Sequence, residues 1–304
     1  MALIMAVGIA GCGDRAAVVS EVVAPAALWF GGDVHLGATA RGGVEGIAGI
    51  LGGAAGIVNL EGPVGEGLGG ARIEGSRVWL TNPAEAPAWL RGQGIVAASI
   101  ANNHAADAGP EGAARTAARL RDGGVVASGG VAGPARLDVG GTVVTLLSHE
   151  LEEPGLDEAL AAELRAGEGT FRAVAFHVSG ARSYLPSPAL RSAVDGAVAA
   201  GANVIVVHGT HVLGPVERRG NVVIAWGLGN LLFDCVCTGE TEALVLRVAL
   251  AGPEGAASVA EVFPVTAGLG GVGVTPAADA EGIFTLLDAI GSSPLTRLGE
   301  GAGF

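Results

Sequence analysis

Short apolar runs alternate along this chain with stretches that have the periodicity of helices. The strands predicted before residue 221 are residues 27–30, 56–60, 95–100, 142–147, 172–176 and 203–207. The predicted helices between them are 83–91, 110–121 and 188–200, and Asn82 is expected to cap the first. From residue 221 the pattern becomes strand-rich, with strands at 222–226, 243–250 and 257–265 before a last helix at 281–290. Repeated strand–helix units predict an α/β fold with a sheet covered on both faces, and the strand-rich part predicts a second sheet packed on the first.

Polar residues stand directly after several of the predicted strands. They are Asp33, Glu61, Asn103, His177 and His208. Because ligands bind at the carboxyl ends of strands in open α/β sheets, we expect these residues to meet in space. Imidazole together with oxygen ligands suits a first-row metal such as Zn, Mn or Fe. Two such ions, bridged by a carboxylate, can polarise a phosphoryl group and generate a hydroxide nucleophile.

Five segments carry a resemblance to a known family. They are Gly-Asp-Val-His-Leu-Gly at 32–37, Asn-Leu-Glu-Gly-Pro at 59–63, Ala-Asn-Asn-His-Ala-Ala-Asp-Ala-Gly at 101–109, the stretch 201–212 that begins Gly-Ala-Asn-Val and ends His-Val, and Trp-Gly-Leu-Gly-Asn-Leu-Leu-Phe-Asp at 226–234. In order and spacing over residues 27–250 they resemble the CapA family of poly-γ-glutamate capsule synthesis proteins, within the calcineurin-like metallophosphoesterases. The resemblance implies a metallo-dependent phosphatase-like fold, a four-layer sandwich of two mixed β-sheets flanked by helices.

The same resemblance implies a role for each polar residue of these segments. The implied metal ligands are Asp33, His35, Glu61, Asn103, His177, His208 and His211, with Glu61 as the bridge between two divalent ions (Mn, Zn or Fe). His104 is expected to face the substrate and to protonate the leaving group or stabilise charge on it. The supporting residues are expected to be Asn59, Asn102, Asp107, Asn230 and Asp234.

The chain departs from the family pattern in two places. The first His of the family's His-Pro-His segment aligns with Gly209, so this chain has His208-x-x-His211 instead. After His177 the family usually has Trp-Gly-x-Glu, whereas this chain has Val-Ser-Gly-Ala and then Arg182. Arg182 is predicted to contact an anionic substrate. Both departures favour the alternative that the domain keeps its scaffold without catalysis.

The leading hypothesis is a metal-dependent hydrolase that acts on a phosphoester or on an anionic envelope polymer, linked to poly-γ-glutamate synthesis, export or anchoring. The alternative is a non-catalytic accessory or polymer-binding protein of a membrane capsule synthase complex. A third reading is a periplasmic binding module for another anionic ligand. The net charge of −13 without a basic patch argues against nucleic acid as a partner. The absence of lysine excludes Schiff-base and P-loop lysine chemistry.

The N-terminus resembles the signal of an exported lipoprotein. Residues 1–12 are apolar and end in Ile-Ala-Gly-Cys, which resembles a lipobox with Cys12 as the lipidated residue. Two or more lipid chains on Cys12 would anchor the protein to a membrane. Residues 13–26 would be a tether, and residues 27–304 a single domain. The predicted location is therefore the bacterial cell envelope.

Cys235 and Cys237 lie on the same side of the chain if this segment is extended. In an exported protein they are expected to form a disulfide, to bind metal or to remain free, and the sequence leaves these alternatives open. His149 also follows a strand but matches none of the family's ligands, so we expect a core histidine with a satisfied side chain.

Overall fold

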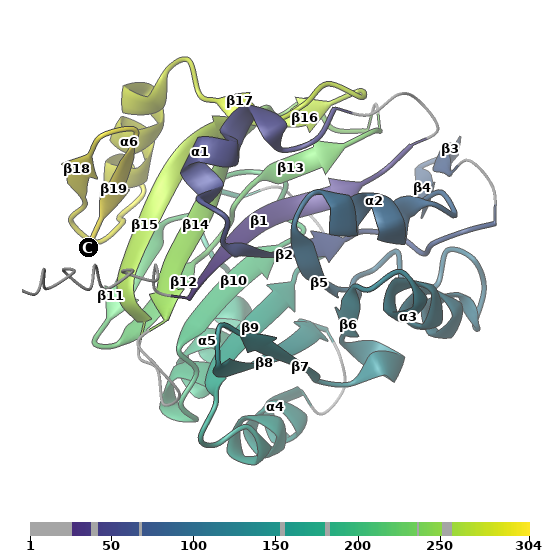
Figure 1. Ribbon diagram of the computed structural model, residues 1–304, viewed down its shortest axis with the longest axis horizontal. Coiled ribbons are helices and arrows are strands. Elements are labelled where there is room, and N and C mark those ends of the chain that lie inside the picture. Colours follow the sequence, from purple (N-terminus) through teal and green to yellow (C-terminus); the bar gives the residue numbers. More distant parts are fainter. Residues whose placement is uncertain are drawn as a thin grey trace, which may run out of the picture.

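A computed structural model gives the arrangement of the chain in space (Figure 1). The residues that it describes are 26–37, 42–66, 69–152, 156–179, 183–235, 237–250 and 257–304. The predicted signal with Cys12, the tether up to residue 25 and Arg182 lie outside the described residues. No helix among the described residues is long and apolar enough to cross a membrane.

The larger of two extensive sheets has the strand order β18-β19-β15-β14-β1-β2-β5-β6. Its strands on this path are β1 (Ala27–His35), β2 (Ala55–Leu60), β5 (Ile95–Ser99), β6 (Val126–Ser128), β14 (Glu242–Leu250), β15 (Ala257–Thr266), β18 (Thr296–Leu298) and β19 (Gly301–Gly303). Three short strands pair alongside, namely β13 (Asn230–Phe233), β16 (Gly268–Leu269) and β17 (Thr275–Pro276). Since β1, β2, β5 and β6 are parallel and β14 is antiparallel to β1, the sheet is mixed.

The second sheet has the order β11-β12-β10-β9-β8-β7 and is also mixed. Its strands are β7 (Ala135–Val139), β8 (Thr142–Glu150), β9 (Phe171–His177), β10 (Val204–His208), β11 (Val216–Arg219) and β12 (Val222–Ala225). A separate two-stranded hairpin consists of β3 (Gly70–Glu74) and β4 (Arg77–Thr81).

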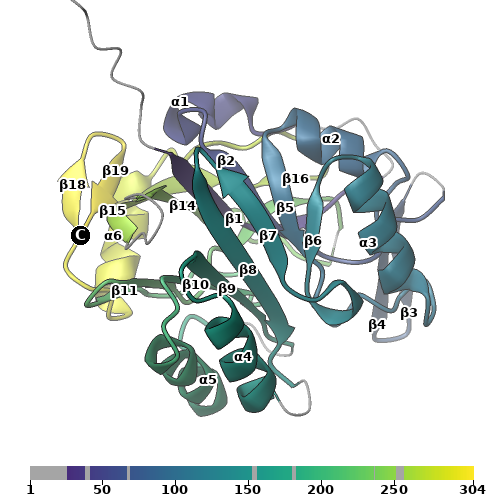
Figure 2. The ribbon, with the colours of Figure 1, turned by 60° about the horizontal axis from the view of Figure 1, so that its bottom comes forward.

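Helices cover the outer face of each sheet (Figures 1 and 2). The α-helices are α1 (Ala48–Leu51), α2 (Ala86–Gly92), α3 (Gly112–Asp122), α4 (Leu156–Ala166), α5 (Pro188–Ala199) and α6 (Ala280–Ala289), and the 3-10 turns are η1 (Glu45–Ile47) and η2 (Gly130–Ala132). Helices α1, α2 and α3 share an apolar cluster with the larger sheet, and α4 and α5 share one with the second sheet.

The side chains of β1 show how the layers are held together. Leu28 and Phe30 belong to the apolar cluster that also contains Phe171 and Val204 of the second sheet. Trp29, between them, belongs instead to the cluster beneath the helices. This alternation follows from the two-residue period of a strand, which sends successive side chains to opposite faces. The predicted four-layer sandwich, with helices outside two mixed sheets, is confirmed.

One local prediction is wrong, because Asn82 does not cap a helix. Helix α2 begins at Ala86, with Glu85 at the N-cap position. The Asn82 side chain is buried, accepts the backbone N–H of Leu36 at 2.8 Å and donates to the carbonyl of Glu61 at 2.9 Å. It therefore joins the segments after β1 and β2, which both carry predicted site residues.

Candidate metal centre

Asp33 lies where the two sheets meet. It is buried in β1, and its Oδ1 accepts a hydrogen bond of 2.9 Å from the amide of Asn59 on β2. From the second sheet, His208 Nδ1 lies 3.3 Å from Oδ1, and His211 Nδ1 lies 3.3 Å from Oδ2. Burial alone would raise the pKa of Asp33, but its contacts with the two histidines hold the pKa well below its usual range. Asp33 is therefore a carboxylate that links both sheets.

Glu61, directly after β2, lies at the centre of a ring of histidines. Its Oε1 lies 3.8 Å from Nε2 of His104, 3.9 Å from Nε2 of His177 and 3.9 Å from Nε2 of His211. Burial and the nearby charge of Asp33 raise the pKa of Glu61 to about 8. Such a shift is what a cation would reverse, because positive charge at this place favours the carboxylate.

Several buried polar atoms of the predicted ligands have no hydrogen-bond partner. They are both ring nitrogens of His177 and Oε2 of Glu61, and both ring nitrogens of His35, which lies beside Phe233 and feels the charge of Asp234. Buried polar atoms in proteins nearly always have a partner, so these atoms call for an explanation. Burial lowers the pKa of His35 to about 4 and that of His177 to about 3, which keeps both rings neutral. Neutral imidazoles with free lone pairs beside a carboxylate are the ligands that a divalent metal requires.

His211 completes the group from a strained backbone position. It is the only described residue other than glycine with a positive φ, 56°. Its Nδ1 lies 2.9 Å from Oδ1 of Asn230, whose amide donates to Thr238 at 3.1 Å. Burial alone would lower the pKa of His211, but Asp33, Glu61 and Asn230 raise it to about 9. Strain of this kind persists where a site over-determines the backbone, and ligand atoms of Asp33, Glu61 and His211 lie within 4.8 Å of one another.

The structure explains how His-x-x-His replaces the expected His-x-His. His208 is the last residue of β10, pairs in register with His177 and points to Asp33. Gly209 has a φ of 83°, and its N–H donates to Asp33 Oδ2 at 3.0 Å. A Cβ at Gly209 would overlap the His177 ring and the Val178 carbonyl. A histidine does not fit at this position, and the preceding residue reaches the cluster instead.

We expect Gly209→Ala to destabilise the fold and to weaken metal binding. The left-handed backbone costs about 1–3 kcal/mol for a residue other than glycine, and the added methyl group must displace His177. Thermal unfolding with and without added metal measures both effects. Gly220→Ala is the matched control, because Gly220 has a φ of 60° and open space around its Cβ. Equal losses in the two variants would show that contact with His177 contributes nothing.

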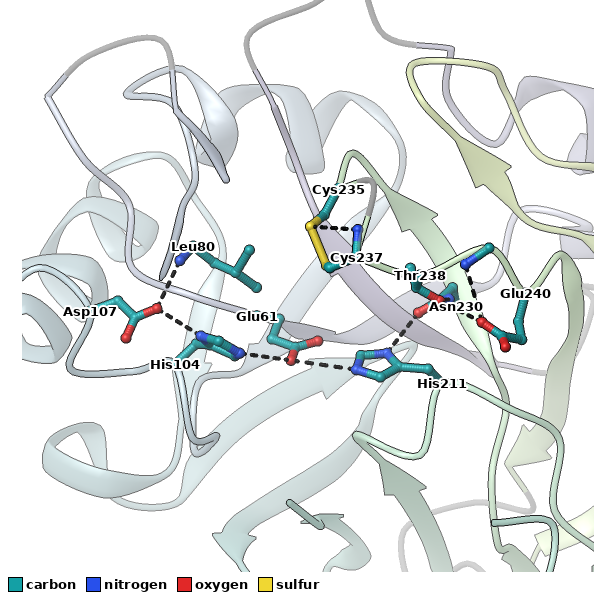
Figure 3. Close-up of a disulfide and its surroundings, with 11 residues drawn as sticks. Glu61, Leu80, His104, Asp107, His211, Asn230, Cys235, Cys237, Thr238 and Glu240 are labelled. Carbon is teal, nitrogen blue, oxygen red and sulfur yellow. Dashed lines mark hydrogen bonds and ion pairs between the residues drawn. A yellow bond between two sulfur atoms is a disulfide. The ribbon is translucent and has the colours of Figure 1, made fainter. Parts of the chain in front are cut away.

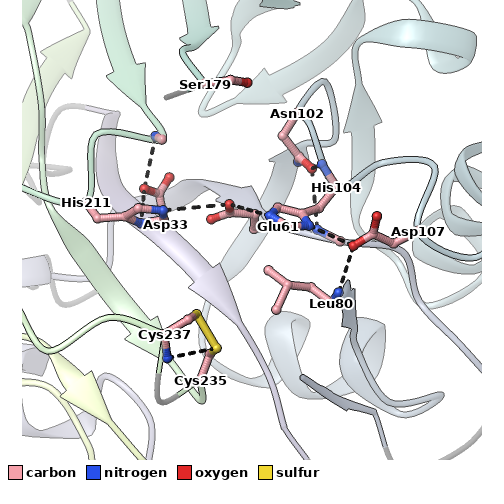
Figure 4. A network of polar contacts seen from close by, with 12 residues as sticks. Asp33, Glu61, Leu80, Asn102, His104, Asp107, Ser179, His211, Cys235 and Cys237 are labelled. Carbon is pink, nitrogen blue, oxygen red and sulfur yellow. Dashed lines mark hydrogen bonds and ion pairs between the residues drawn. A yellow bond between two sulfur atoms is a disulfide. The ribbon is translucent and has the colours of Figure 1, made fainter. Parts of the chain in front are cut away.

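His104 approaches the cluster from the side of the larger sheet (Figure 4). Its Nδ1 lies 2.7 Å from Oδ2 of Asp107, and this oxygen also accepts the backbone N–H of Leu80 at 2.7 Å. Asp107 is thus fixed at two points and orients the ring, so that Nε2 faces Glu61. A histidine held by a carboxylate, with its other nitrogen toward the reacting centre, is equipped for proton transfer.

Comparison with known proteins identifies the family of the chain. A family model described as bacterial capsule synthesis protein PGA_cap matches residues 28–235, more than half of the 304 residues. The chain belongs to this family. The predicted resemblance to CapA capsule synthesis proteins is therefore confirmed, and the matched segment of this PGA_cap family member contains all the predicted ligands as well as His104.

Two further comparisons complete this result. No curated protein matches the chain. A solved structure described as a novel phosphatase from Mycoplasma pneumoniae is similar, with a TM-score of 0.48 and 11% sequence identity, and the match covers 80% of this chain and 88% of that chain.

The two neighbouring amides of the PGA_cap segment at 101–109 differ in their placement. Asn102 is buried, accepts the backbone N–H of His104 at 3.2 Å and donates to Asn59 Oδ1 at 3.2 Å. The Asn103 side chain is exposed instead. The structure therefore brings Asn102 into the polar network and leaves Asn103 outside it, so that the role of Asn103 as a ligand remains a prediction.

The remaining supporting residues lie around the cluster. Asp234 packs against Gly37, where a Cβ would overlap its carboxylate, and its charge acts on His35. Sequence reasoning missed the backbone donors of Gly209 and Leu80, because an N–H is present in every residue except proline and leaves no signal in the sequence. It also missed Thr238, which lies eight residues beyond Asn230 and contacts its amide.

The structure answers the open question about Cys235 and Cys237 and meets the expectation for His149. Cys235 and Cys237 form a disulfide (Figure 3), and Cys235 packs with Leu80 and Phe233 in a small apolar cluster. The Phe233 ring lies 5.5 Å from the His35 ring and 5.2 Å from the His211 ring.

His149 is a buried histidine whose Nε2 lies 2.7 Å from Glu163, as expected of a satisfied core residue.

We expect metal binding by the purified protein to strengthen as the pH rises. Without metal, Glu61 keeps a proton up to a pKa of about 8 and His211 up to about 9. Both groups must lose these protons to act as ligands, so binding near neutral pH releases about one to two protons and affinity rises up to roughly tenfold per pH unit for each. Titration calorimetry in buffers of different ionisation enthalpy measures the release. An affinity that does not change between about pH 6 and about pH 8 would contradict the shifts of Glu61 and His211.

Proposed function

We propose that this protein is a metal-dependent hydrolase of phosphoesters that acts in capsule formation. The observation that supports it best is the set of buried ligand atoms of Glu61, His177 and His35 that have no hydrogen-bond partner. The His104–Asp107 pair lies next to them and adds a route for a proton. The family description supports the role in capsule formation, and the residues of the site support the hydrolytic chemistry.

The residues that would hold metal come from both sheets. They are Asp33, His35 and Glu61 from the larger sheet, and His177, His208 and His211 from the second sheet. We propose two divalent ions, of Mn, Zn or Fe, because six side chains exceed what one tetrahedral ion uses. When bound, they supply charge for the phosphoryl oxygens and a nucleophile derived from water. Glu61, central among these residues, would contribute its carboxylate to holding the ions.

The chain's own residues then carry out the proton transfer. Asp107 would accept the Nδ1–H of His104 and hold the ring so that Nε2 points to the cluster. From there His104 gives its proton to the departing oxygen of the substrate. Neutral His35 and His177 keep their lone pairs, since burial prevents them from competing for that proton.

Location and partners are part of the same proposal. Lipidation at Cys12 would hold the protein on the outer side of a membrane, within reach of an anionic capsule polymer and of a membrane synthase complex. The accessory, non-catalytic role remains the second candidate, supported by the loss of the family's Glu after His177. The presence of candidate ligands at every position from Asp33 to His211 named above favours catalysis over this alternative.

The test uses the soluble protein that starts after Cys12. After chelator treatment it is reloaded with Mn, Zn or Fe, analysed for metal content, and assayed on chromogenic phosphomonoesters and phosphodiesters. We expect about two ions per chain and hydrolysis that depends on them. A protein that takes up metal without hydrolysing any ester would support the accessory role. One that takes up no metal would refute the metal centre itself.

A further inference from the structure

The β3–β4 hairpin presents two arginines on one tryptophan. Arg72 pairs in register with Trp79 across the hairpin, and Arg77 stands two residues before Trp79 on the same strand. All three side chains therefore share one face. The Arg77 guanidinium lies 3.7 Å from the centre of the Trp79 ring, and that of Arg72 lies 5.1 Å from it. Stacking on an aromatic ring holds a guanidinium in a defined plane while its N–H groups stay free to bind.

Backbone and side-chain contacts connect this hairpin to the candidate metal centre. Leu80, next to Trp79, donates its N–H to Asp107 at 2.7 Å. Arg77 itself lies 3.4 Å from the other oxygen of Asp107. Because Asp107 holds His104, which in turn faces Glu61, Arg77 stands at the edge of the site on the side where the proton is delivered.

The two arginines differ in how firmly contacts within the protein hold their guanidinium groups. The side chain of Arg77 is 59% exposed, and its contact with Asp107 at 3.4 Å is long and engages one terminal nitrogen. A guanidinium has five N–H donors, so most of those of Arg77 face solvent beside His104. Arg72 is equally exposed, at 60%, but its contact with Glu74 on its own strand is shorter, with 2.6 Å between nitrogen and oxygen. Arg77 is therefore the arginine that is held less firmly and that also stands next to Asp107.

The charge around the site indicates what kind of group Arg77 would bind. The chain carries a net charge of −13, and Asp33, Glu61 and Asp107 all lie within the site. A substrate with several negative charges would be repelled by such a surface except where a cation faces it. The metal ions would neutralise the reacting phosphate, but a second anionic group farther along the substrate needs its own partner.

We propose that Arg77 binds a second anionic group of the substrate, a carboxylate or a phosphate, next to the phosphoester that is cleaved. The inference rests on the proposed hydrolase function and adds Arg77 as the residue that selects substrates with a second anionic group over isolated esters. An oxyanion on the exposed edge of Arg77 accepts paired N–H donors, while Trp79 supports the guanidinium from behind. The hairpin then acts as a specificity element for the neighbouring site.

The kinetic test compares two substrates that differ by one charge. Methyl p-nitrophenyl phosphate lacks a second anion, and carboxyethyl p-nitrophenyl phosphate carries a carboxylate. For Arg77→Gln we expect KM to rise about tenfold for the carboxylated ester, with little change for the methyl ester. Arg72→Gln is the matched control and is expected to leave both KM values unchanged. A fall in kcat that is equal for both esters would overturn the proposal, because it would assign Arg77 only to the positioning of Asp107.

A binding measurement keeps the inference testable even if no ester is hydrolysed. Titration calorimetry on the metal-loaded protein compares propylphosphonate, carboxyethylphosphonate and ethylenediphosphonate. We expect the two ligands that carry a second anionic group to bind more tightly than propylphosphonate to the natural protein and to Arg72→Gln, but not to Arg77→Gln. The ligand whose affinity rises more shows whether Arg77 prefers a carboxylate or a phosphate. No gain from either second anion would refute the role of Arg77, whereas a gain without hydrolysis would refute only the hydrolase.

Discussion

Asp33→Asn is expected to abolish metal retention while the protein stays folded. Asp33 is the carboxylate that faces both His208 and His211, and an amide of the same shape removes the charge that attracts the cation. Turnover of phosphoesters should fall by roughly 10³-fold or more, because metal ions contribute several kcal/mol to stabilising the transition state. Elemental analysis after dialysis, together with kcat/KM, measures both losses.

The matched control for Asp33→Asn removes a different carboxylate that faces a histidine. Glu163→Gln removes the carboxylate charge that lies 2.7 Å from His149, which is outside the ring of histidines around Glu61. We expect this variant to keep its metal and its activity. Full metal content in Asp33→Asn would contradict the assignment of Asp33 as a ligand, and a metal loss shared by both variants would point to general destabilisation.

His104→Gln is expected to keep the metal and to lose turnover. General acid catalysis contributes typically 10²–10⁴-fold, so kcat should fall by about that factor for esters with poor leaving groups such as alkoxides. For p-nitrophenolate, which departs without a proton, the fall should be much smaller. A series of phosphodiesters with leaving groups of graded basicity measures the difference as a steeper dependence of kcat in the variant.

Asp107→Asn tests the orientation of His104 while the histidine itself stays in place. The amide still accepts the Leu80 N–H through its oxygen, but it places no negative charge beside the His104 ring. We expect a loss of kcat smaller than that of His104→Gln, with unchanged metal content. If His104→Gln slowed good and poor leaving groups equally, His104 would bind the substrate rather than protonate it.

Much of the fold follows from local patterns. The apolar runs ending at Asp33, His177 and His208 are strands β1, β9 and β10, because alternation and β-branched residues encode a strand within a few positions. The β3–β4 hairpin was missed because its short strands are mostly exposed, and β13 was missed because four buried residues are too few to show a period. Asn82 was misread as a cap, because a capping residue and a buried amide look the same in sequence.

The sequence by itself determined the family, the layered α/β class and the residue types of a metal site, since these depend on order and spacing along the chain. Only the tertiary structure decided that His208 reaches Asp33 past Gly209, that Asn102 is buried while Asn103 is exposed, and that Arg77 stands beside Asp107. The physical reason is that these outcomes depend on the packing of two sheets and a hairpin against one another. Contacts between distant segments are set by the shapes of whole surfaces, which no local pattern records.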